Sequence, residues 1–277
     1  MSTGHRGVDP VFAERYGPWA LVAGASEGIG ASFAHQIAAA GLDLVLVARR
    51  PGPLEETAAA IRSTHGASVR TVVADLTGDG LLETLAAKTR DLEIGLLVYN
   101  AGAVHGAARF HEADLEVPLA LVRLNCLGPV LLCHHFGARM LEGGRGGIIL
   151  LSSLSAVSGA ARTVTYSATK AFDQVFAEGL WAELSPRGVD VLGLIAGATR
   201  TPAMVRSGAL IGGEAFPGMD PDDVAREGLE RVAEGPVWVV GDTNRAGWEA
   251  MRSLTRAELV AMMSEGARAV YGLPEDS

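Results

Sequence analysis

The sequence predicts an α/β fold in which a doubly wound, parallel sheet of seven strands carries helices on both faces. Seven short apolar segments alternate with segments of helical length from residue 20 onward. These apolar segments are nearly continuous in hydrophobicity, which is typical of parallel strands covered on both faces. No repeat and no low-complexity linker interrupts the pattern, so a single domain is predicted for residues 1–277.

The same pattern gives the order of the elements. Strands are expected at residues 20–23, 44–47, 69–74, 94–99, 148–151, 189–195 and 237–240. Helices are expected at 31–40, 54–65, 81–90, 115–141, 166–184 and 221–234, and a capping box at Thr255 and Glu258 opens a C-terminal helix. Asp220 caps the helix at 221–234, and Pro221 takes its first position. Residues 1–17 are interpreted as an N-terminal arm, 199–220 as a substrate lid and 241–277 as a C-terminal helical extension.

Composition excludes several classes of partner. The 277 residues are 48% hydrophobic and carry a net charge of −9 without a dense basic patch, so a nucleic-acid partner is not expected. No apolar stretch is judged to approach the roughly 20 residues that cross a bilayer, and residues 1–10 lack the apolar core of a signal peptide. A cytoplasmic chain without a membrane partner is therefore predicted. Cys126 and Cys133 lie two helical turns apart, too far for a disulfide. His134 and His135 point in different directions, so no metal site is expected.

A glycine-rich loop follows the first strand directly. It reads Gly24-Ala25-Ser26-Glu27-Gly28-Ile29-Gly30 and precedes a helical pattern. Glycines let a backbone approach a pyrophosphate closely, and the N-terminus of the helix offers unpaired N–H groups. The spacing differs from the standard Gly-x-Gly-x-x-Gly, and a purely structural turn is the alternative. The context favours a Rossmann-type dinucleotide site.

The end of the second strand bears on the choice of cofactor. An acidic residue there accepts from a ribose 2′-hydroxyl, whereas an arginine pairs with a 2′-phosphate. This chain has Arg49 and Arg50 at that point. NADP(H) is therefore predicted in preference to NAD(H), which stays an alternative. Glu27 argues mildly for NAD(H), and solvated surface charges are the other interpretation of the two arginines.

Tyr166 and Lys170 form a candidate acid/base pair. Lys170 is one of only two lysines, the other being Lys88, and it follows Tyr166 by four residues. On a helix this spacing puts the phenol and the ammonium on one face. A cation close to a phenol favours the phenolate and helps it exchange a proton near neutral pH. A half-buried tyrosine beside a solvated lysine is the alternative interpretation.

Together these motifs resemble the short-chain dehydrogenase/reductase family over roughly residues 18 to 240. Beyond the glycine loop, Asp75 resembles the family's adenine contact, and Asn100-Ala101-Gly102 resembles the turn after its fourth strand. Asn125 matches the family's helix asparagine, and Ser153 precedes Tyr166 by the family's spacing of thirteen. The resemblance implies cofactor contacts at Gly24, Ser26, Glu27, Gly28, Ile29, Gly30, Arg49, Arg50, Asp75, Leu76, Asn100, Ala101, Gly102, Tyr166, Lys170, Gly197, Thr199 and Thr201.

The resemblance also implies a catalytic set of Asn125, Ser153, Tyr166 and Lys170. Ser153 would hydrogen-bond the substrate oxygen while Tyr166 gives or takes its proton. Lys170 would favour the phenolate and bind the nicotinamide ribose, and Asn125 would join a path that resupplies the proton through a water. Ser153 is preferred to Ser152, which strand alternation turns to the opposite face, and Ser155 is kept as a substrate contact.

Three positions depart from the family pattern. Ala23 replaces the usual threonine, Tyr99 replaces a common asparagine, and Ala196-Gly197 replaces Pro-Gly after the sixth strand. None of these changes removes a catalytic group. The loss of the threonine hydroxyl is expected to cost about 1 kcal/mol of stability.

The segment between Thr201 and Met219 is rich in glycine and apolar residues. It is interpreted as a mobile lid over a hydrophobic substrate, with Met204 as a substrate contact, although a bare surface loop is the alternative. Val104, Leu154 and Val164 are candidate pocket residues. The predicted substrate is a lipophilic ketone, aldehyde or secondary alcohol.

Two functions follow. The first is an NADP(H)-dependent oxidoreductase that interconverts a carbonyl and an alcohol, and the second is a non-catalytic NADP(H)-binding regulatory protein. The complete catalytic set favours the enzyme, because a sensor needs only the nucleotide site. The resemblance also implies a homotetramer or homodimer, and the apolar helices expected at 115–141 and 166–184 are candidate interfaces.

Overall fold

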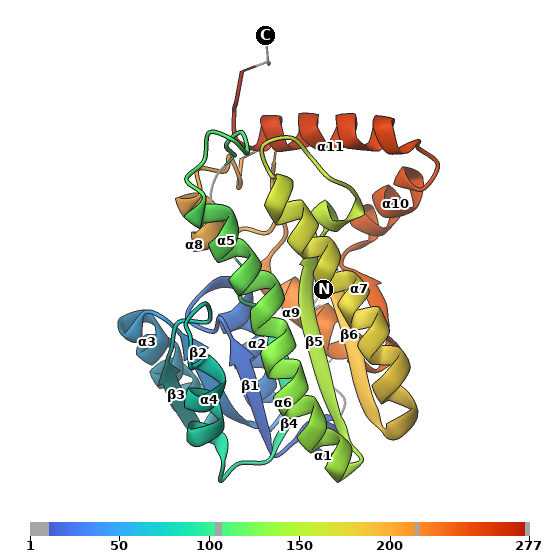
Figure 1. Ribbon diagram of the computed structural model, residues 1–277. Coiled ribbons are helices and arrows are strands. Elements are labelled where there is room, and N and C mark those ends of the chain that lie inside the picture. Colours follow the sequence, from blue (N-terminus) through green and yellow to red (C-terminus); the bar gives the residue numbers. More distant parts are fainter. Residues whose placement is uncertain (1–10, 103–106, 214–215, 275–277) are drawn as a thin grey trace, which may run out of the picture.

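The computed structural model describes residues 11–102, 107–213 and 216–274. Seven strands form one sheet in the order β3-β2-β1-β4-β5-β6-β7, and every neighbouring pair is parallel. The predicted doubly wound, seven-stranded parallel sheet is confirmed (Figure 1). The strands are β1 (Trp19–Ala23), β2 (Asp43–Ala48), β3 (Val69–Val73), β4 (Ile94–Tyr99), β5 (Gly146–Ser153), β6 (Val189–Ala196) and β7 (Val237–Val239).

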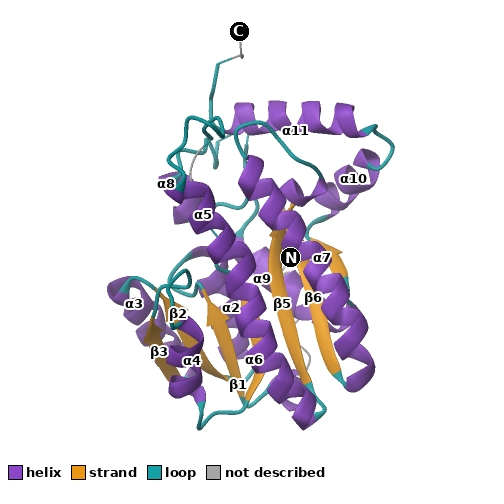
Figure 2. Cartoon of the chain, in the orientation of Figure 1, coloured by secondary structure: helices purple, strands orange, loops and turns teal. Residues whose placement is uncertain are grey.

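Helices cover both faces of this sheet (Figure 2). The helices are α1 (Phe12–Tyr16), α2 (Gly28–Ala39), α3 (Pro51–His65), α4 (Leu81–Thr89), α5 (Glu116–Val122), α6 (Gly128–Gly143), α7 (Val164–Leu184), α8 (Pro202–Arg206), α9 (Pro221–Arg231), α10 (Asp242–Met251) and α11 (Arg256–Val270). One core cluster joins the sheet to α2, α3 and α9, and a second joins it to α4, α6 and α7. Strand residues alternate between the two: Ala20 and Val22 of β1 belong to the first, Leu21 and Ala23 to the second.

Several element boundaries differ from the predicted ones. α2 begins at Gly28 rather than at residue 31, so the end of the glycine loop is already the first turn of the helix. α3 begins at Pro51 rather than at residue 54, because proline presets the dihedral angle of a first helical position. The predicted caps are confirmed: Asp220 accepts from the backbone N of Asp222 at 3.0 Å, and both halves of the Thr255 capping box are present.

The helix expected at 115–141 runs from Glu116 to Gly143, with a π-helical segment, η1 (Arg123–Leu127), between α5 and α6. By length and composition it could cross a membrane, with a mean hydropathy of 1.5 in its most apolar window. The expectation that no apolar stretch reaches such a length was therefore wrong. The helix packs on β4, β5 and α7, and its residue Asn125 is fully buried.

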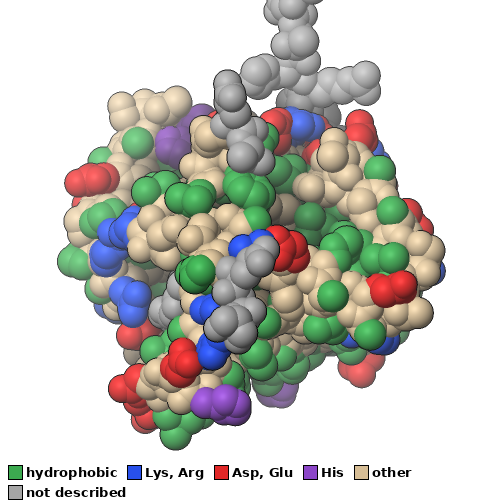
Figure 3. All heavy atoms as spheres, turned by 90° about the horizontal axis from the view of Figure 1, so that it is seen from above, with side chains coloured by type: hydrophobic (Ala, Val, Ile, Leu, Met, Phe, Trp, Pro, Cys, Tyr) green, Lys and Arg blue, Asp and Glu red, His purple; other side chains and the backbone are tan. Residues whose placement is uncertain are grey.

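The order of the strands reverses between β1 and β4, so their carboxyl ends border a crevice of the kind that binds ligands in such folds. The helices α5, α8 and α11 lie beyond this edge of the sheet (Figure 1). Seen from above, hydrophobic side chains occupy much of this end of the molecule, with arginines and carboxylates among them (Figure 3).

Candidate active site

The three glycines of the loop after β1 are required by its geometry. A Cβ on Gly30 would lie 2.0 Å from the carbonyl oxygen of Gly24, and one on Gly24 would lie 2.9 Å from the backbone N of Ala101. Gly24 and Gly28 also have φ values of +85° and +56°, which side chains disfavour. The loop therefore turns tightly against the end of β4 and leads directly into the N-terminus of α2, which suits an anionic ligand.

Asn100 holds this loop in place from the neighbouring strand. Its Nδ2 donates to the carbonyl oxygen of Gly24 at 2.9 Å, and the backbone N of Ala101 donates to that of Ala23 at 2.9 Å. Ser26 is held from α3, where Thr57 Oγ1 donates to its carbonyl oxygen at 3.3 Å. The turn 100–102 thus lies beside the glycine loop, as a cofactor that contacts both would require.

Arg50 and Glu27 form an ion pair with 2.6 Å between Nη2 and Oε2. Arg206 of α8 binds the same carboxylate, with its Nη1 3.0 Å from Oε2. Although burial opposes them, the hydrogen bonds from Arg206 and Arg50 hold the pKa of Glu27 below its usual value. Glu27 is therefore a charged bridge between the glycine loop, α3 and the segment predicted to be a lid. Arg49 is exposed and free to turn toward a ligand.

Asp75 and Leu76 follow β3 near Arg49. Asp75 Oδ1 accepts from the backbone N and the hydroxyl of Thr77 at 2.9 and 2.7 Å. Although burial opposes them, these bonds lower the pKa of Asp75, and Arg49 adds to the effect. The carboxylate therefore fixes the turn after β3 through Oδ1, and its contact with an adenine ring stays a prediction.

Lys170 and Tyr166 lie one turn apart on α7, and Lys170 is almost completely buried at 4% exposure. This excludes the interpretation of Lys170 as a solvated surface charge. Its Nζ donates to the carbonyl oxygen of Leu151 at 2.7 Å and to Asp173 Oδ2 at 2.9 Å. Although burial alone would lower it, the Asp173 carboxylate and then the Tyr166 phenol raise the pKa of Lys170. The phenol therefore lies within electrostatic reach of a firmly held cation.

Asn125 faces α7 from within the π-helical segment. Its Nδ2 donates to Thr169 Oγ1 at 2.9 Å, and that hydroxyl donates to the carbonyl oxygen of Tyr166 at 2.9 Å. Among the described residues, Asn125 Oδ1 is buried without a hydrogen-bond partner. A buried carbonyl oxygen of this kind calls for a donor, and a water or ligand hydroxyl would satisfy it.

Ser152 and Ser153 point to opposite sides at the end of β5, as predicted. Ser152 is buried and donates to the carbonyl oxygen of Lys170 at 2.7 Å, so its role is to hold α7. Ser153 is partly exposed, and its Oγ accepts from the backbone N of Ser155 at 3.2 Å. The backbone of Ser155 therefore holds the Ser153 side chain, whose hydroxyl proton is left for another acceptor.

The space around Gly102 fits the nicotinamide end of a dinucleotide. A Cβ on Gly102 would lie 3.2 Å from Lys170 Nζ and 3.7 Å from Asn125 Oδ1. The glycine therefore leaves open the small volume onto which a lysine donor and an unpaired acceptor both face. Ribose hydroxyls both donate and accept hydrogen bonds, so they match this pair.

The sequence profile of the short chain dehydrogenase family matches residues 18–209, which is more than half of the chain. The chain belongs to the short-chain dehydrogenase family. This confirms the predicted family and the predicted class of enzyme, an oxidoreductase that acts on alcohol and carbonyl groups.

Similar proteins cover nearly the whole of this short-chain dehydrogenase. It is 32% identical over 254 residues to the 7beta-hydroxysteroid dehydrogenase of Clostridium sardiniense. The matched region covers 92% of this chain and 97% of that relative. A solved structure from a study of 7beta-hydroxysteroid dehydrogenase stereoselectivity has a TM-score of 0.85 at 29% identity and covers 91% of this chain and 98% of its own. A short-chain dehydrogenase from Sphingobium yanoikuyae in complex with NADPH has a TM-score of 0.76 at 31% identity, covering 89% and 95% of the two chains.

The segment predicted as a lid in this short-chain dehydrogenase is anchored at both ends. The backbone N of Arg200 donates to Met219 at 2.9 Å, and its side chain pairs with Asp220 at 2.9 Å. Thr201 caps α8 by accepting from the backbone N of Met204 at 3.2 Å. The prediction of a mobile lid did not include a helix, whereas the structure places α8 within the segment. Five residues are too few to show a helical period.

The residues expected around the nicotinamide lie just before α8. Thr199 is buried and donates to the carbonyl oxygen of Gly197 at 2.9 Å. The methyl group of Thr201 packs over Gly28, where a Cβ would lie 2.9 Å from it. Met204 is half-buried on α8. Thr201 of this segment therefore packs on the glycine loop. Val104, another predicted pocket residue, falls outside the described residues.

The C-terminal extension reaches the active site, which sequence reasoning did not foresee. Leu210 donates its backbone N to Val270 at 2.7 Å, and Ser264 of α11 accepts from the backbone N of Ala161 at 2.9 Å. Burial raises the pKa of Tyr271, a hydrogen bond with Ser207 opposes the rise, and the nearby Tyr166 adds to it. The helix α11 therefore joins the lid to the segment between β5 and α7 and places Tyr271 close to Tyr166.

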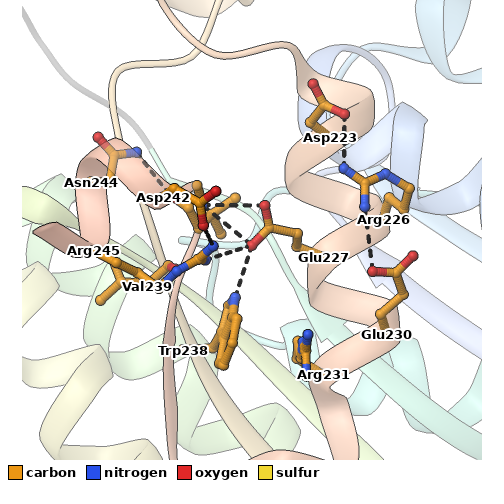
Figure 4. Close-up of polar contacts among 12 residues, drawn as sticks. Asp223, Arg226, Glu227, Glu230, Arg231, Trp238, Val239, Asp242, Asn244 and Arg245 are labelled. Carbon is orange, nitrogen blue, oxygen red and sulfur yellow. Dashed lines mark hydrogen bonds and ion pairs between the residues drawn. The ribbon is translucent and has the colours of Figure 1, made fainter. Parts of the chain in front are cut away.

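Glu227 of α9 anchors the start of this extension (Figure 4). Its Oε2 accepts from Trp238 Nε1 and from Arg245 Nη1, both at 2.9 Å. The guanidinium groups of Arg231 and Arg245 lie 4.4 and 4.9 Å from the centroid of the Trp238 ring. This cluster fixes α10 against β7, and Asn244 of α10 then packs on Gly197, where a Cβ would lie 2.6 Å from its Nδ2.

Metal-ligand groups are not found in the described part of the chain, where no three His, Cys, Asp or Glu side chains converge. Cys126 and Cys133 are both free. Ser153, Tyr166, Lys170 and Asn125 stay the predicted catalytic set.

Proposed function

We propose that this short-chain dehydrogenase interconverts a lipophilic, bulky ketone and the corresponding secondary alcohol with NADP(H). The observation that carries the proposal is the buried Lys170 one helical turn from Tyr166, facing the open space at Gly102. A buried ammonium is costly to keep in a fold, and its place beside a phenol suits acid/base catalysis.

Tyr166 gives its proton to the carbonyl oxygen during reduction and takes a proton from the alcohol during oxidation. Ser153 donates a hydrogen bond to the same oxygen and stabilises the charge that develops there. Lys170 favours the phenolate and donates to the nicotinamide ribose, while Asn125 Oδ1 holds a water that returns the proton. The nicotinamide, when bound, supplies or accepts the hydride.

The cofactor is proposed to bind along the crevice at the carboxyl ends of β1 and β4. Its pyrophosphate would meet the N-terminus of α2, and its adenine end would lie between Arg49 and Asp75. The NADPH complex of the similar Sphingobium yanoikuyae enzyme supports the preference for NADP(H). Arg49→Ala should weaken NADPH binding far more than NADH binding, measured by fluorescence titration. Equal losses would refute the preference.

The proposed substrate is a ketone or alcohol of steroid-like size. The similar Clostridium sardiniense protein is a 7beta-hydroxysteroid dehydrogenase, and that similarity covers 92% of this chain. The helices α8 and α11 lie beyond the carboxyl ends of the strands (Figure 1), and with Tyr271 we propose that they form a roof that contacts the apolar substrate. Met204 and Ser155 stay proposed substrate contacts.

A panel of hydroxysteroids, bulky aryl ketones and small aldehydes tests the reaction, with NADPH absorbance as the readout. Turnover is expected on the bulky ketones, and Tyr166→Phe should abolish it while NADPH binding is kept. Full activity in that variant would refute the role of Tyr166. Tight NADPH binding without turnover on any compound would instead support the regulatory alternative.

We further propose that the chain is a cytoplasmic homodimer or homotetramer. Only a third of the apolar window in the helix from Glu116 to Gly143 is buried. Exposed apolar side chains follow this helix and α7: Leu119, Val122, Leu127, Val130, Val175 and Trp181. A second copy of the chain would cover them. Light scattering after gel filtration tests this, and Val130→Lys with Val175→Lys should shift the mass to that of a monomer.

A further inference from the structure

Asp173 is a buried acid to which the reaction above gives no role. It lies on α7 three residues after Lys170, is 2% exposed, and its Oδ2 is 2.9 Å from Lys170 Nζ. We propose that Asp173 is a positioning residue, which holds the Lys170 ammonium in its charged form and aims it at the cofactor ribose. This inference rests on the proposed function, because it assigns a task to the partner of a proposed catalytic lysine.

The geometry leaves Lys170 one proton for a ligand. An ammonium carries three donors. Two are used in the described part of the chain, by the carbonyl oxygen of Leu151 at 2.7 Å and by Asp173 at 2.9 Å. The atom Nζ also faces Gly102, where a Cβ would lie 3.2 Å away. The two protein bonds therefore act as a fork that directs the third N–H toward the open space at Gly102.

The electrostatics point the same way. Burial strongly disfavours an isolated ammonium, but a carboxylate in contact offsets that cost. Burial also raises the pKa of the Asp173 carboxyl, against the opposing effect of Lys170. The Lys170 ammonium thus favours the charged form of Asp173, as the Asp173 carboxylate favours the charged form of Lys170. Removal of the carboxylate would leave the ammonium buried beside a neutral carbonyl oxygen.

The other titratable groups that face the pair are phenols and thiols. Tyr166 lies on the same helix, Cys126 faces it from η1, Cys133 from α6 and Tyr99 from β4. Burial raises the pKa of Cys126 to about 11 and raises those of Cys133 and Tyr99 as well. Among the described residues around Lys170, Asp173 is therefore the group that supplies the negative charge.

The test is the pH profile of kcat/KM for alcohol oxidation in Asp173→Asn. The amide keeps the shape and the acceptor oxygen but removes the charge, so Lys170 loses its proton at lower pH. We expect the alkaline limb of the profile to move down by at least one pH unit, with the rate near pH 6 reduced less than threefold. Asp173→Glu should move the limb back. A profile that coincides with the wild type would overturn the inference.

A matched control is Asp190→Asn. Asp190 is another buried aspartate in an ion pair, with Arg15, at the opposite end of the sheet. Its replacement should lower the melting temperature and leave the pH profile unchanged. NADPH titration by fluorescence gives a readout without turnover: the affinity of Asp173→Asn should fall above pH 8 relative to its value at pH 6. An affinity ratio equal to that of the wild type would count against the inference.

A double-mutant cycle covers the case in which Asp173→Asn folds poorly. Lys170→Met and Asp173→Leu should each lower the urea midpoint, because each leaves one buried charge alone. The double variant should recover most of that loss, whereas simple addition of the two losses would refute the pairing. Absence of turnover in the wild-type protein on all substrates would count against the proposed function, while an unchanged profile in an active Asp173→Asn would count against Asp173 alone.

Discussion

Tyr99 ends β4, and its hydroxyl donates to the carbonyl oxygen of Leu124 at 2.6 Å. The side chain is 3% exposed, and burial raises its pKa, so the phenol stays a neutral donor. Leu124 belongs to the π-helical segment and precedes Asn125 directly. A Cβ on Gly128 would lie 2.1 Å from this hydroxyl, so a glycine at that position makes room for it. Tyr99 therefore supports the segment that presents Asn125.

Tyr99→Phe removes this donor and leaves a buried carbonyl oxygen unpaired. Such a loss costs about 1–3 kcal/mol, which lowers Tm by about 2–4 °C per kcal/mol in a chain of this size. If the resulting shift of Asn125 destabilises the transition state by about 1.4 kcal/mol, kcat falls about tenfold. Differential scanning fluorimetry and steady-state NADPH turnover measure the two effects.

Tyr16→Phe is the matched control. Tyr16 is also buried, and its hydroxyl donates to Asp190 at 2.6 Å at the other end of the sheet. We expect both variants to lose stability and only Tyr99→Phe to lose kcat. The reasoning is wrong if Tyr99→Phe keeps both the melting temperature and kcat of the wild type, or if the two variants lose kcat equally.

Three further predictions follow from single contacts. Glu27→Gln removes the carboxylate that Arg50 and Arg206 share, so the affinity for NADPH should rise about threefold relative to that for NADH at low salt. Titration at two salt concentrations measures this change, and an equal change for both cofactors contradicts it. Gly28→Ala and Gly66→Ala each place a side chain at positive φ, and each should lower the free energy of urea unfolding by about 1–2 kcal/mol. Only Gly28→Ala should also weaken NADPH binding, because nothing lies near Gly66 that an added Cβ could disturb. Thr255→Ala removes the N-terminal cap of α11 and should lower stability by about 1 kcal/mol. It should also lower the turnover of bulky ketones more than that of small ones. An equal fall for both classes of ketone would argue against the roof.

The fold was predictable because its signals are local. Continuous apolar segments mark strands buried on both faces, and the glycine loop marks the turn from β1 into α2. Tyr166 and Lys170 were predicted from their helical spacing of four, and Ser153 from the resemblance to a family in which a serine precedes the tyrosine by thirteen residues. Short elements such as α8 have too few residues to show a period, and the π-helical segment depends on Tyr99, which lies 25 residues from Leu124 in sequence.

Asp173 could not be recognised from sequence for a different reason. A carboxylate three residues after a lysine on a helix is usually a solvated i,i+3 pair that contributes a few tenths of a kcal/mol. Only tertiary packing, with β4, β5 and η1 closing over α7, turns this ordinary pair into a buried one. The roof formed by α11 escaped for the same reason, because contacts such as Ser264 with Ala161 join segments 103 residues apart.

The choice of lysine at position 170 follows from these surroundings. The side chain at this position is 4% exposed and must bind the Leu151 carbonyl oxygen and Asp173 together. It also faces Gly102, where a Cβ would lie only 3.2 Å from Nζ. A compact ammonium with three donors meets all of these demands, whereas a planar guanidinium with five donors would bring two or more N–H groups that the site does not satisfy. A chain that uses arginine almost everywhere else therefore keeps lysine where the charge is almost completely buried and one proton must be left for the ribose.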